Sequence, residues 1–530
     1  MNSSKIPFLI GVTGHRNIRE SDVETLYLTV KSILKGFIDR YPNTPIQMMN
    51  SLAEGSDLLC ADAAASLGIP LIVVLPTNAD EYSASFSQAD KKRFHSHLTY
   101  AESVLISPEI EERIPSISER DYRFRQAGIY ISTHCQLLIA LWDGDMTQKD
   151  GCGSAAAVSF MLSGSYNPKE GVPNRPAKAS MVYHVLTPRS DNGEAGELQK
   201  LGDYESFLEI LSRTDEFNHL SESQKKQGYS LFEQVDVPPK IYMLDSLYSL
   251  ADQLSIRYAK RYRLVLALMA LFGTLLTLSF LLYDEAELHW MILATGAALL
   301  LMVISHRYAV RSACHRRYLE YRVLAESLRV QAFLKYAGSE LNVPSLMPLI
   351  QQEETTWIVS ALSALSAVRI DPVSHTIRDL WIVSQRDYHA KAIQKSGFKR
   401  AGSDRIVSVA LILSASIYVI ALILELTIFG TFFPSLAQLS SPDLFRTVIK
   451  IILGGLSAGT LFIANYYGKQ SLVRVETDHI KMQHFFDQML SLIDRQGQND
   501  KILKHLAREE LNENGNWYSY QSNNTPDINL

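Results

Sequence analysis

Four long stretches with almost no charge dominate the second half of this 530-residue chain. They are Leu264–Tyr283, Leu288–Ser305, Ile406–Phe433 and Ile451–Gly468, of 20, 18, 28 and 18 residues, and Glu425 is their one acidic residue. A helix needs about 18–20 apolar residues to cross about 30 Å of hydrocarbon, so each stretch is long enough to do so. One such stretch could be a buried helix of a soluble protein, but four together predict a membrane protein with four transmembrane helices.

Most of the basic residues that flank these stretches lie on one side. They stand before the first stretch, after the second, before the third and after the fourth: Arg257, Lys260, Arg261, Arg263, Arg307, Arg311, Arg316, Arg317, Lys395, Lys399, Arg400, Arg405, Lys469 and Arg474. The first short turn has no basic residue, and the second has only Arg446 and Lys450. Because loops rich in Lys and Arg stay in the cytoplasm, we expect both termini and the central segment to be cytoplasmic.

The segments between and after the stretches predict further helices. Apolar residues at helical spacing, such as Leu319, Val323 and Leu328, predict a cytoplasmic helical hairpin over 306–404. The expected domains are an α/β domain (1–195), a helical linker (196–260), an all-α membrane domain (261–510) and a disordered tail (511–530).

Two features of the membrane stretches bear on function. Glu425 lies inside the third stretch, where an ionisable group is costly; it either faces the interior of a helix bundle or lies near enough to the outer end to reach the interface. Gly455 and Gly459 have the spacing that lets helices pack closely, within one chain or between chains. These three residues are the candidates for a pore or for helix association.

The first 190 residues alternate strand and helix patterns. Continuous apolar strands are expected at FLIGVTG, PIQMMN, IPLIVVLP, ESVLIS, CQLLIALW and MVYHVL, with amphipathic or alanine-rich helices between the first of them. Continuous apolar strands separated by helices are typical of a parallel sheet covered on both faces. The fold class predicted for this half is therefore Rossmann-like α/β.

In such a sheet the ligand lies beyond the carboxyl ends of the strands. The residues expected there lie in four loops that follow strands and at the end of the sixth strand: Gly14, His15, Arg16, Glu54, Gly55, Ser56, Asp57, Trp142, Asp143, Gly144, Gly153, Ser154 and Arg189. Glycines allow the backbone to approach a ligand, and amides at a helix start attract phosphate. Arg16 can pair with a phosphate, and Glu54 or Asp57 with ribose hydroxyls. Arg120, Arg123 and Arg125 form either a solvated helix face or a further phosphate contact.

Other classes of function find little support. The net charge of -5 does not indicate nucleic-acid binding. The four cysteines have no metal or disulfide spacing, and there is no GxxxxGK[ST] or HExxH motif. The first residues lack a signal peptide's apolar core. We expect no metal, no cofactor and no catalytic residue.

Five motifs in order give the first half a resemblance to a known family. GVTGHR, SLAEGSD, GIPLIVVLP, YISTHCQLLIALWDG and GCGSAAAV resemble the SLOG superfamily over about residues 5–190. This superfamily includes the lonely-guy nucleotide hydrolases and ADP-ribose-sensing domains of channels and anti-phage effectors. The later segments ADQLSIRYAKRYR, YRVLAESLRVQAF and LWIVSQRDYH resemble SLATT-type membrane effector domains. At the place of the hydrolases' PGGxGTxxE motif the chain has GCGSAAA, without the catalytic glutamate.

The resemblance implies a bacterial defence effector in the inner membrane. Its SLOG domain is expected to bind a nucleotide second messenger, of the cyclic ADP-ribose or cyclic oligonucleotide type, that a separate enzyme produces. The expected consequence is homo-oligomerisation and a pore or disruption of the bilayer. Two alternatives remain: a membrane-tethered N-glycosidase of the lonely-guy type, for which Glu54 is the candidate acid, and a non-catalytic membrane scaffold.

Overall fold

The computed structural model describes most of the chain. The described residues are 5–110, 117–148, 151–163, 166–167, 172–173, 180–189, 193–223, 229–233, 235–367, 376–427, 442–468 and 472–523. The chain divides into two compact units. The first comprises Met1–Ala251, Val323–His375 and Asn499–Gly515, and the second comprises Asp252–Arg322, Thr376–Gln498 and Asn516–Leu530.

A seven-stranded sheet forms the centre of the first unit. Its order is β4-β3-β2-β1-β5-β8-β9, and the strands are β1 (Phe8–Gly14), β2 (Ile46–Asn50), β3 (Leu71–Leu75), β4 (Ser103–Ile106), β5 (Leu137–Trp142), β8 (Met181–Leu186) and β9 (Leu198–Gly202). All neighbours are parallel except β8 and β9. The predicted, mostly parallel α/β fold is therefore confirmed, and the chain order reverses at β1, between β2 and β5.

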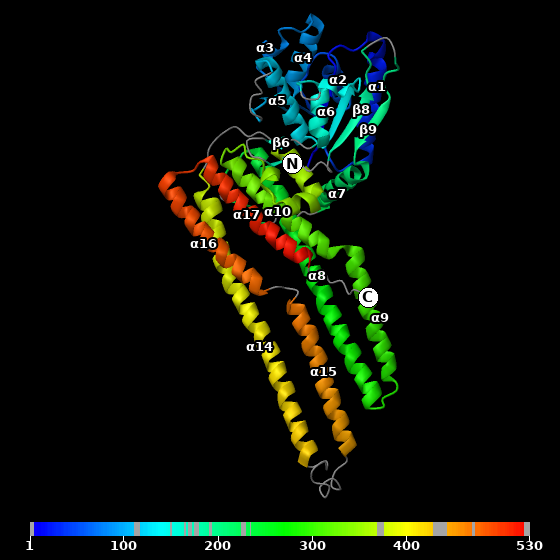
Figure 1. Cartoon of the computed structure of the whole chain (residues 1–530), viewed down its shortest axis with the longest axis vertical. Helices are drawn as coiled ribbons and strands as arrows, with labels where there is room; N and C mark the ends of the chain where they lie inside the picture. The colour runs from blue at the N-terminus through cyan, green and yellow to red at the C-terminus, as the bar shows by residue number, and fades with distance from the viewer. Residues whose placement is uncertain are drawn as a thin grey trace. The chain divides into compact units, whose positions relative to one another are not determined.

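Helices cover both faces of the sheet (Figure 1). The helices of one face are α1 (Val23–Arg40), α2 (Ser56–Ser66), α3 (Ala79–Ser83), α4 (Gln88–Tyr100) and α7 (Tyr204–Ser223), and those of the other are α5 (Glu119–His134), α6 (Ser154–Ser163) and α13 (Thr356–Ser366). Short elements complete the unit: the 3-10 turns η1 (Glu20–Asp22) and η2 (Met146–Gln148), the strand pair β6 (Tyr166–Asn167) and β7 (Val172–Pro173), and helices α11 (Val343–Leu346) and α12 (Leu349–Glu354).

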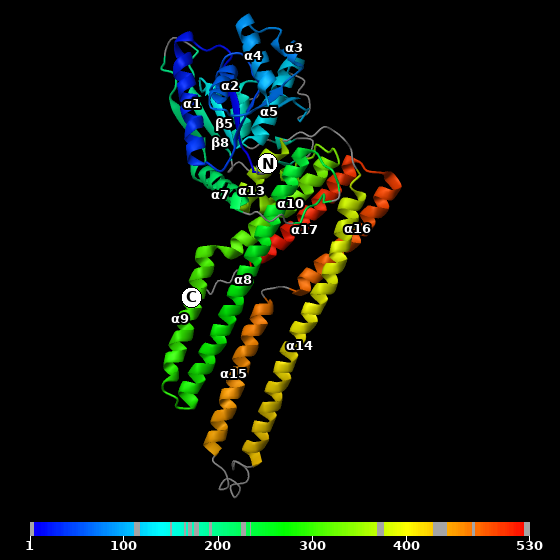
Figure 2. The same ribbon diagram turned by 180° about the vertical axis from the view of Figure 1, so that it is seen from behind.

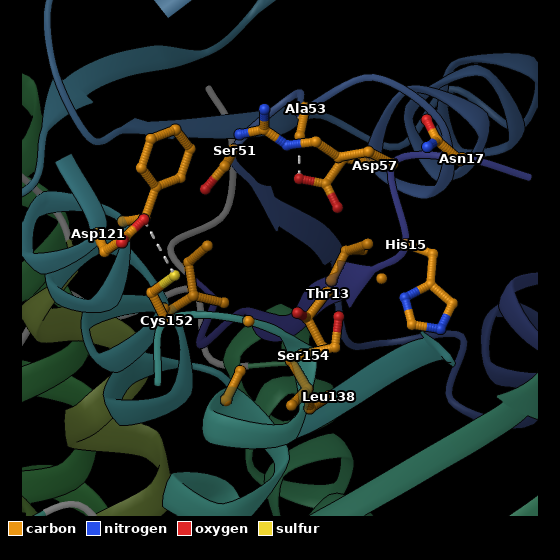
Figure 3. A pocket seen from close by; sticks show the side chains of 18 of the residues that line it. Thr13, His15, Asn17, Ser51, Ala53, Asp57, Asp121, Leu138, Cys152 and Ser154 are labelled. Atoms are coloured by element: carbon orange, nitrogen blue, oxygen red, sulfur yellow. Dashed lines mark hydrogen bonds between the residues drawn. The ribbon is translucent and has the colours of Figure 1, made fainter. Parts of the chain in front are cut away.

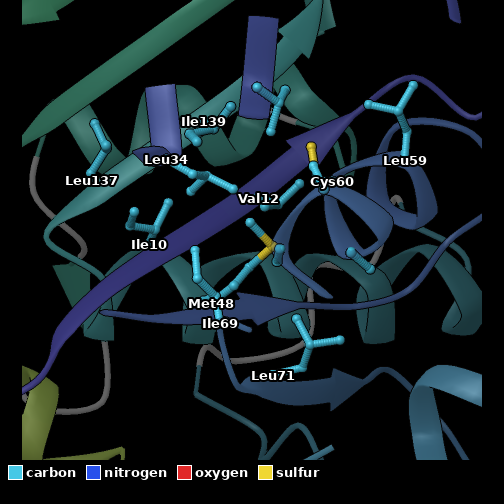
Figure 4. Close-up of a cluster of buried hydrophobic side chains, with 14 of the residues drawn as sticks. Ile10, Val12, Leu34, Met48, Leu59, Cys60, Ile69, Leu71, Leu137 and Ile139 are labelled. Carbon is cyan, nitrogen blue, oxygen red and sulfur yellow. The ribbon is translucent and has the colours of Figure 1, made fainter. Parts of the chain in front are cut away.

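The two cores follow from the alternation of side chains along each strand. In β1, Ile10 and Val12 point to the core under α1 and α2, shown in Figure 4, while Leu9 points to the core under α5 and α6. Both sets are almost fully buried, which explains why the strands are apolar without interruption. The two cores hold the strand ends in fixed positions, and the loops that line the cavity follow the strands at the carboxyl edge of the sheet.

The predicted disordered tail is wrong for most of its length. Residues 500–522 form α17 (Asp500–Ser522), in which Leu506 and Leu511 are fully buried. The Gln351 amide donates to Asn514 Oδ1 at 2.7 Å, so the polar residues of this helix are also engaged. The Asn-rich composition of 511–530 suggested disorder, but apolar residues at helical spacing give the helix one buried face. Residues 524–530 of the tail lie outside the described residues.

The helical regions 196–260 and 306–404 also differ from expectation. Residues 198–202, expected in a linker, add β9 as an antiparallel edge strand. The expected hairpin is divided between the two units, because 323–375 belong to the first and α13 packs on the sheet through Ala364 and Ala367. Helix α10 (Cys314–Tyr336) has residues in both units.

The second unit contains the apolar stretches. Among the described residues, four helices are long and apolar enough to cross a membrane: α8 (Pro239–Glu285), α9 (Met291–Ser312), α14 (Ser384–Thr427) and α15 (Pro442–Gly468). Both views show α8 beside α9 and α14 beside α15 (Figures 1 and 2). Their apolar side chains are largely exposed, which is unfavourable in water and indicates a membrane protein. The end of the third stretch, 428–433, and the Glu425 side chain lie outside the described residues.

The glycines of α15 pack within the chain. An added Cβ at Gly455 would lie 3.2 Å from Leu278, and one at Gly459 would lie 3.7 Å from Thr274, both on α8. On the opposite helix, a Cβ at Gly273 would lie only 2.4 Å from the Phe462 ring. Small residues therefore bring α8 and α15 of one chain together.

The part of α14 that precedes its apolar stretch packs along α16 (Leu472–Gln496). Directly before α14, residues Arg378–Val383 form a π-helical segment, and Arg378 Nε donates to Asp494 Oδ1 of α16 at 2.7 Å. Further along, His389 Nδ1 and His479 Nδ1 lie 2.9 Å apart. Burial lowers the pKa of His479, which favours the neutral form of this imidazole in the contact.

Candidate functional site

A cavity of about 600 Å³ lies at the carboxyl edge of the sheet, where the chain order reverses (Figure 3). We call it the edge pocket. It is bounded by the loops after β1 and β2, by the start of α6 and by one face of α5. Its volume falls in the range of about 300–1,000 Å³ that is typical of sites for small molecules, and its place is the one where open α/β sheets bind ligands.

Two loops are locked together at one side of the pocket. The Ser56 hydroxyl donates to the main-chain oxygen of His15 at 2.8 Å, and the Ser56 N–H donates to the same oxygen at 3.0 Å. Gly14 has no room for a side chain, because a Cβ would lie 2.4 Å from Ser56 Cβ. Gly55 has φ +78°, and a Cβ there would lie 2.0 Å from the Arg16 oxygen. These glycines allow the two loops to touch and fix the start of α2 beside Arg16.

The loop after β2 turns inward on a strained residue. Leu52 has φ 56°, although it is not a glycine, and its side chain is fully buried. The Leu52 N–H donates to Asn50 Oδ1 at 2.6 Å, and Asn50 is itself fully buried. Burial and this bond hold the unfavourable conformation, which places Ser51 and Ala53 on the pocket wall.

Asp57 is the buried acid of the pocket. Figure 3 shows its side chain on the pocket wall, and one carboxylate oxygen accepts the Ala53 N–H at 3.2 Å. Burial raises the pKa of Asp57 to about 7, although the Ala53 bond and the nearby Arg16 work in the opposite direction. At neutral pH the carboxyl is therefore about half protonated, and it can donate or accept a proton in a ligand contact.

A second polar cluster joins the loop after β1 to the ends of β5 and β8. Arg189 Nε lies 3.1 Å from Asp143 Oδ2 and 3.2 Å from His15 Nε2. The main-chain N–H of Asp143 also donates to His15 Nε2, at 3.1 Å. Burial and the neighbouring Arg189 lower the pKa of His15, which keeps the imidazole neutral and able to accept these bonds. The exposed guanidinium of Arg189 is thus held at the pocket rim.

Helix α5 forms the opposite wall. Asp121 Oδ1 accepts a long hydrogen bond from Cys152 Sγ at 3.5 Å, as Figure 3 shows, and Arg125 donates to the Gly151 oxygen at 2.8 Å. These contacts hold the loop that opens α6, where Gly153 and Ser154 line the pocket. The first turn of α6 presents its N–H groups here, an arrangement that favours phosphate.

The structure gathers about half of the predicted site residues on the pocket surface. Those that line it are Gly14, His15, Arg16, Asp57, Gly153, Ser154 and Arg189. The others support it from behind or lie beside it: Glu54, Gly55, Ser56, Trp142, Asp143 and Gly144. The Glu54 carboxylate accepts the Ser87 N–H at 2.7 Å and so anchors the start of α4. Whether a ligand touches these residues stays a prediction.

Several lining residues were not predicted from the sequence, and Tyr82, Asp121 and Phe124 are the polar or aromatic ones among them that bear on ligand contact. Tyr82 follows β3, and the rule that ligands lie beyond strand ends also applies to that strand. The two residues of α5 precede a strand, so no strand-end rule selects them. Arg120, one of the three arginines left open between a solvated face and a ligand contact, also lines the pocket.

Within the described ranges, no group of three or more His, Cys, Asp or Glu side chains could hold a metal ion. Comparison with models of known protein families found no match, and a search of curated proteins found no relative. The pocket chemistry and the membrane helices therefore carry the functional argument.

Proposed function

We propose that the chain is a membrane-bound sensor and effector, in which a nucleotide-type ligand binds the edge pocket and alters the state of the membrane helices. One observation carries the proposal. A pocket at the switch point of a parallel sheet, with Arg16, Arg120 and Arg189 on its lining, occurs in a chain with four helices that can cross a membrane. Guanidinium groups and the start of α6 suit phosphate, and a mostly parallel sheet suits a nucleotide.

The membrane side of the proposal rests on topology and resemblance. The basic flanks favour cytoplasmic termini, which would place the pocket on the side where an intracellular messenger is made. The resemblance to SLOG and SLATT domains supports a role in bacterial defence at the inner membrane, with a separate enzyme supplying a cyclic ADP-ribose-type or cyclic oligonucleotide signal. The ligand must bind one assembly state better than another, since otherwise it shifts no equilibrium. A homo-oligomer that opens a pore or disrupts the bilayer meets this requirement.

A second candidate, a membrane-tethered nucleotide N-glycosidase, is favoured by Asp57 and not by Glu54. Asp57 is buried, with its pKa raised to about 7, as a proton donor requires. Glu54 is instead bonded to the Ser87 N–H. In this reaction the C1′–N bond would break as Asp57 passes its proton to the leaving base. Water would add its hydroxyl to C1′ of the ribose and return its remaining proton to the Asp57 carboxylate, so that Asp57 ends the cycle protonated.

Equilibrium binding and product analysis on the full chain in detergent separate the two. The sensor proposal predicts saturable nucleotide binding that Arg16→Ala weakens by about 10-fold or more, as expected for loss of a charged phosphate contact. The bound nucleotide is recovered intact. Release of free base at enzymatic rates, abolished by Asp57→Asn, would support the hydrolase instead. Absence of binding by any nucleotide would contradict both and leave a membrane scaffold.

A further inference from the structure

A second cavity opens beside the edge pocket. It has a volume of about 420 Å³ and lies beyond β3, between α3, the turn after it and the start of α5. We call it the side chamber. The edge pocket and the side chamber share three lining residues, Tyr82, Arg120 and Phe124, so the two cavities are adjacent and these residues form their shared wall.

The shared wall carries cations and an aromatic ring. Arg16 Cζ lies 4.9 Å from the centroid of the Phe124 ring, and Arg120 Cζ lies 5.6 Å from it. The ring of Tyr82 packs against the same Phe124 at 5.6 Å. Cation–π contacts thus hold the guanidinium groups of Arg16 and Arg120 beside a ring that both cavities share, and guanidinium groups suit the phosphates of a ligand.

The Tyr82 hydroxyl is buried without a partner. Its oxygen has no hydrogen bond within the part of the chain that the structure describes, although the side chain is almost fully buried. Burial raises the pKa of Tyr82, so the hydroxyl is neutral and keeps its proton. A buried polar atom that bonds to nothing costs about 1–3 kcal/mol, and this cost lies in a residue that lines both cavities.

The charges of the two cavities differ. The edge pocket has three arginines, against Asp121, the half-protonated Asp57 and Asp143, which pairs with Arg189 at 3.1 Å. In the side chamber, Glu81 and Glu119 offset Arg120 and Arg123. Arg123 is engaged further, because its Nε donates to Glu119 at 3.1 Å and its Nη1 donates to Thr77 Oγ1 at 3.2 Å. The edge pocket therefore suits an anion, and the side chamber suits a neutral ring with donors and acceptors.

We propose that the edge pocket and the side chamber form one bipartite site for a dinucleotide, with its phosphates at the Arg16–Arg120 junction and its second base in the side chamber. This inference rests on the proposed function and narrows the ligand class: a mononucleotide fills the edge pocket only. The second base gains the Phe124 face of the wall and the polar groups of Thr77 and Glu81.

Ser85 provides the test, because it lines the side chamber alone and its side chain is exposed. Ser85→Trp fills the chamber, and Ser85→Ala is the matched control. The full chain in detergent is titrated calorimetrically with AMP and GMP, and with NAD, cyclic di-AMP and cyclic di-GMP. At least one dinucleotide is expected to bind about 10-fold tighter than its mononucleotide, the size of effect that one further stacked base contributes. Ser85→Trp should remove this advantage, leave mononucleotide binding within about two-fold of that of Ser85→Ala, and preserve the Tm.

Two results would overturn the bipartite site while leaving the sensor intact. One is equal binding of mononucleotides and dinucleotides by the unsubstituted chain, and the other is a retained dinucleotide advantage in Ser85→Trp. Failure of every nucleotide to bind would overturn the proposed function itself, so the two failures are distinguishable.

Discussion

Replacing Asp57 by Asn tests the electrostatics of the edge pocket directly. The carboxyl is buried at the start of α2, and burial raises its pKa from 3.8 to about 7. Between these values the folded protein keeps a proton that the unfolded chain releases. The contribution of Asp57 to stability is therefore greatest at low pH and is lost as the pH rises through about 7.

The size of this effect follows from the two pKa values. Between pH 5 and pH 8.5, a group with pKa 3.8 unfolded and about 7 folded lowers the free energy of unfolding by about 2–3 kcal/mol. The unit that contains Asp57 has about 320 residues, and at about 2.1 cal/mol/K of unfolding entropy per residue each kcal/mol corresponds to about 1.5 °C in Tm. Asn cannot ionise, and its amide oxygen can still accept the Ala53 N–H.

The assay is thermal unfolding of the full chain in detergent, with both proteins measured at each pH. Subtracting the Tm of the unsubstituted chain from that of Asp57→Asn cancels the other titrating groups. We expect this difference to rise by about 3–5 °C from pH 5 to pH 8.5. A difference that stays constant, or that falls with pH, would refute a raised pKa and with it the protonated carboxyl in the pocket.

Three further substitutions test the packing. Gly55→Ala should destabilise the fold by about 1–3 kcal/mol and weaken nucleotide binding, because its φ is +78° and its Cβ would meet a main-chain oxygen at 2.0 Å; Gly68→Ala, with φ +69° but open space, is the control for unfolding by heat. Gly273→Val should separate α8 from α15, since even a Cβ would lie 2.4 Å from an aromatic ring, whereas Gly296→Val, the control, meets open space. Cysteine cross-linking between α8 and α15 reports the separation, and equal cross-linking in the two variants would argue against this packing. Arg329→Met removes the cation that the buried Glu326 and Glu510 share at 2.6 and 3.2 Å, so it should lower the free energy of unfolding by about 3–5 kcal/mol. Chemical unfolding should show a smaller loss at low pH, where the acids are neutral, and a loss that does not depend on pH would contradict the reasoning.

The strands and the site edge were predictable because their signals are local. Ile10 and Val12 alternate with Leu9 in an uninterrupted apolar run, which is how a strand buried on both faces reads in sequence. The strand-end rule then found His15 and Arg16 on the pocket lining, and Arg189 at the end of β8.

The rest depends on tertiary contacts that a sequence does not display. Either Glu54 or Asp57 was expected to hold ribose hydroxyls, and Glu54 was the candidate acid, yet Asp57 is buried on the pocket wall while Glu54 bonds to the start of α4. Phe124 gave no signal because an aromatic residue on a helix usually belongs to the core. Leu511 belonged to a segment with a disordered composition, and its burial requires partners distant in the chain.

Dye release from liposomes that contain the full chain tests the central claim most directly. Release is measured before and after addition of each nucleotide that binds, for the unsubstituted chain and for Arg16→Ala. If ligand binding at the edge pocket controls the membrane helices, a bound nucleotide changes the rate of release, and Arg16→Ala needs a correspondingly higher concentration for the same change. Release that no bound nucleotide alters, or that responds identically in Arg16→Ala, would contradict the account.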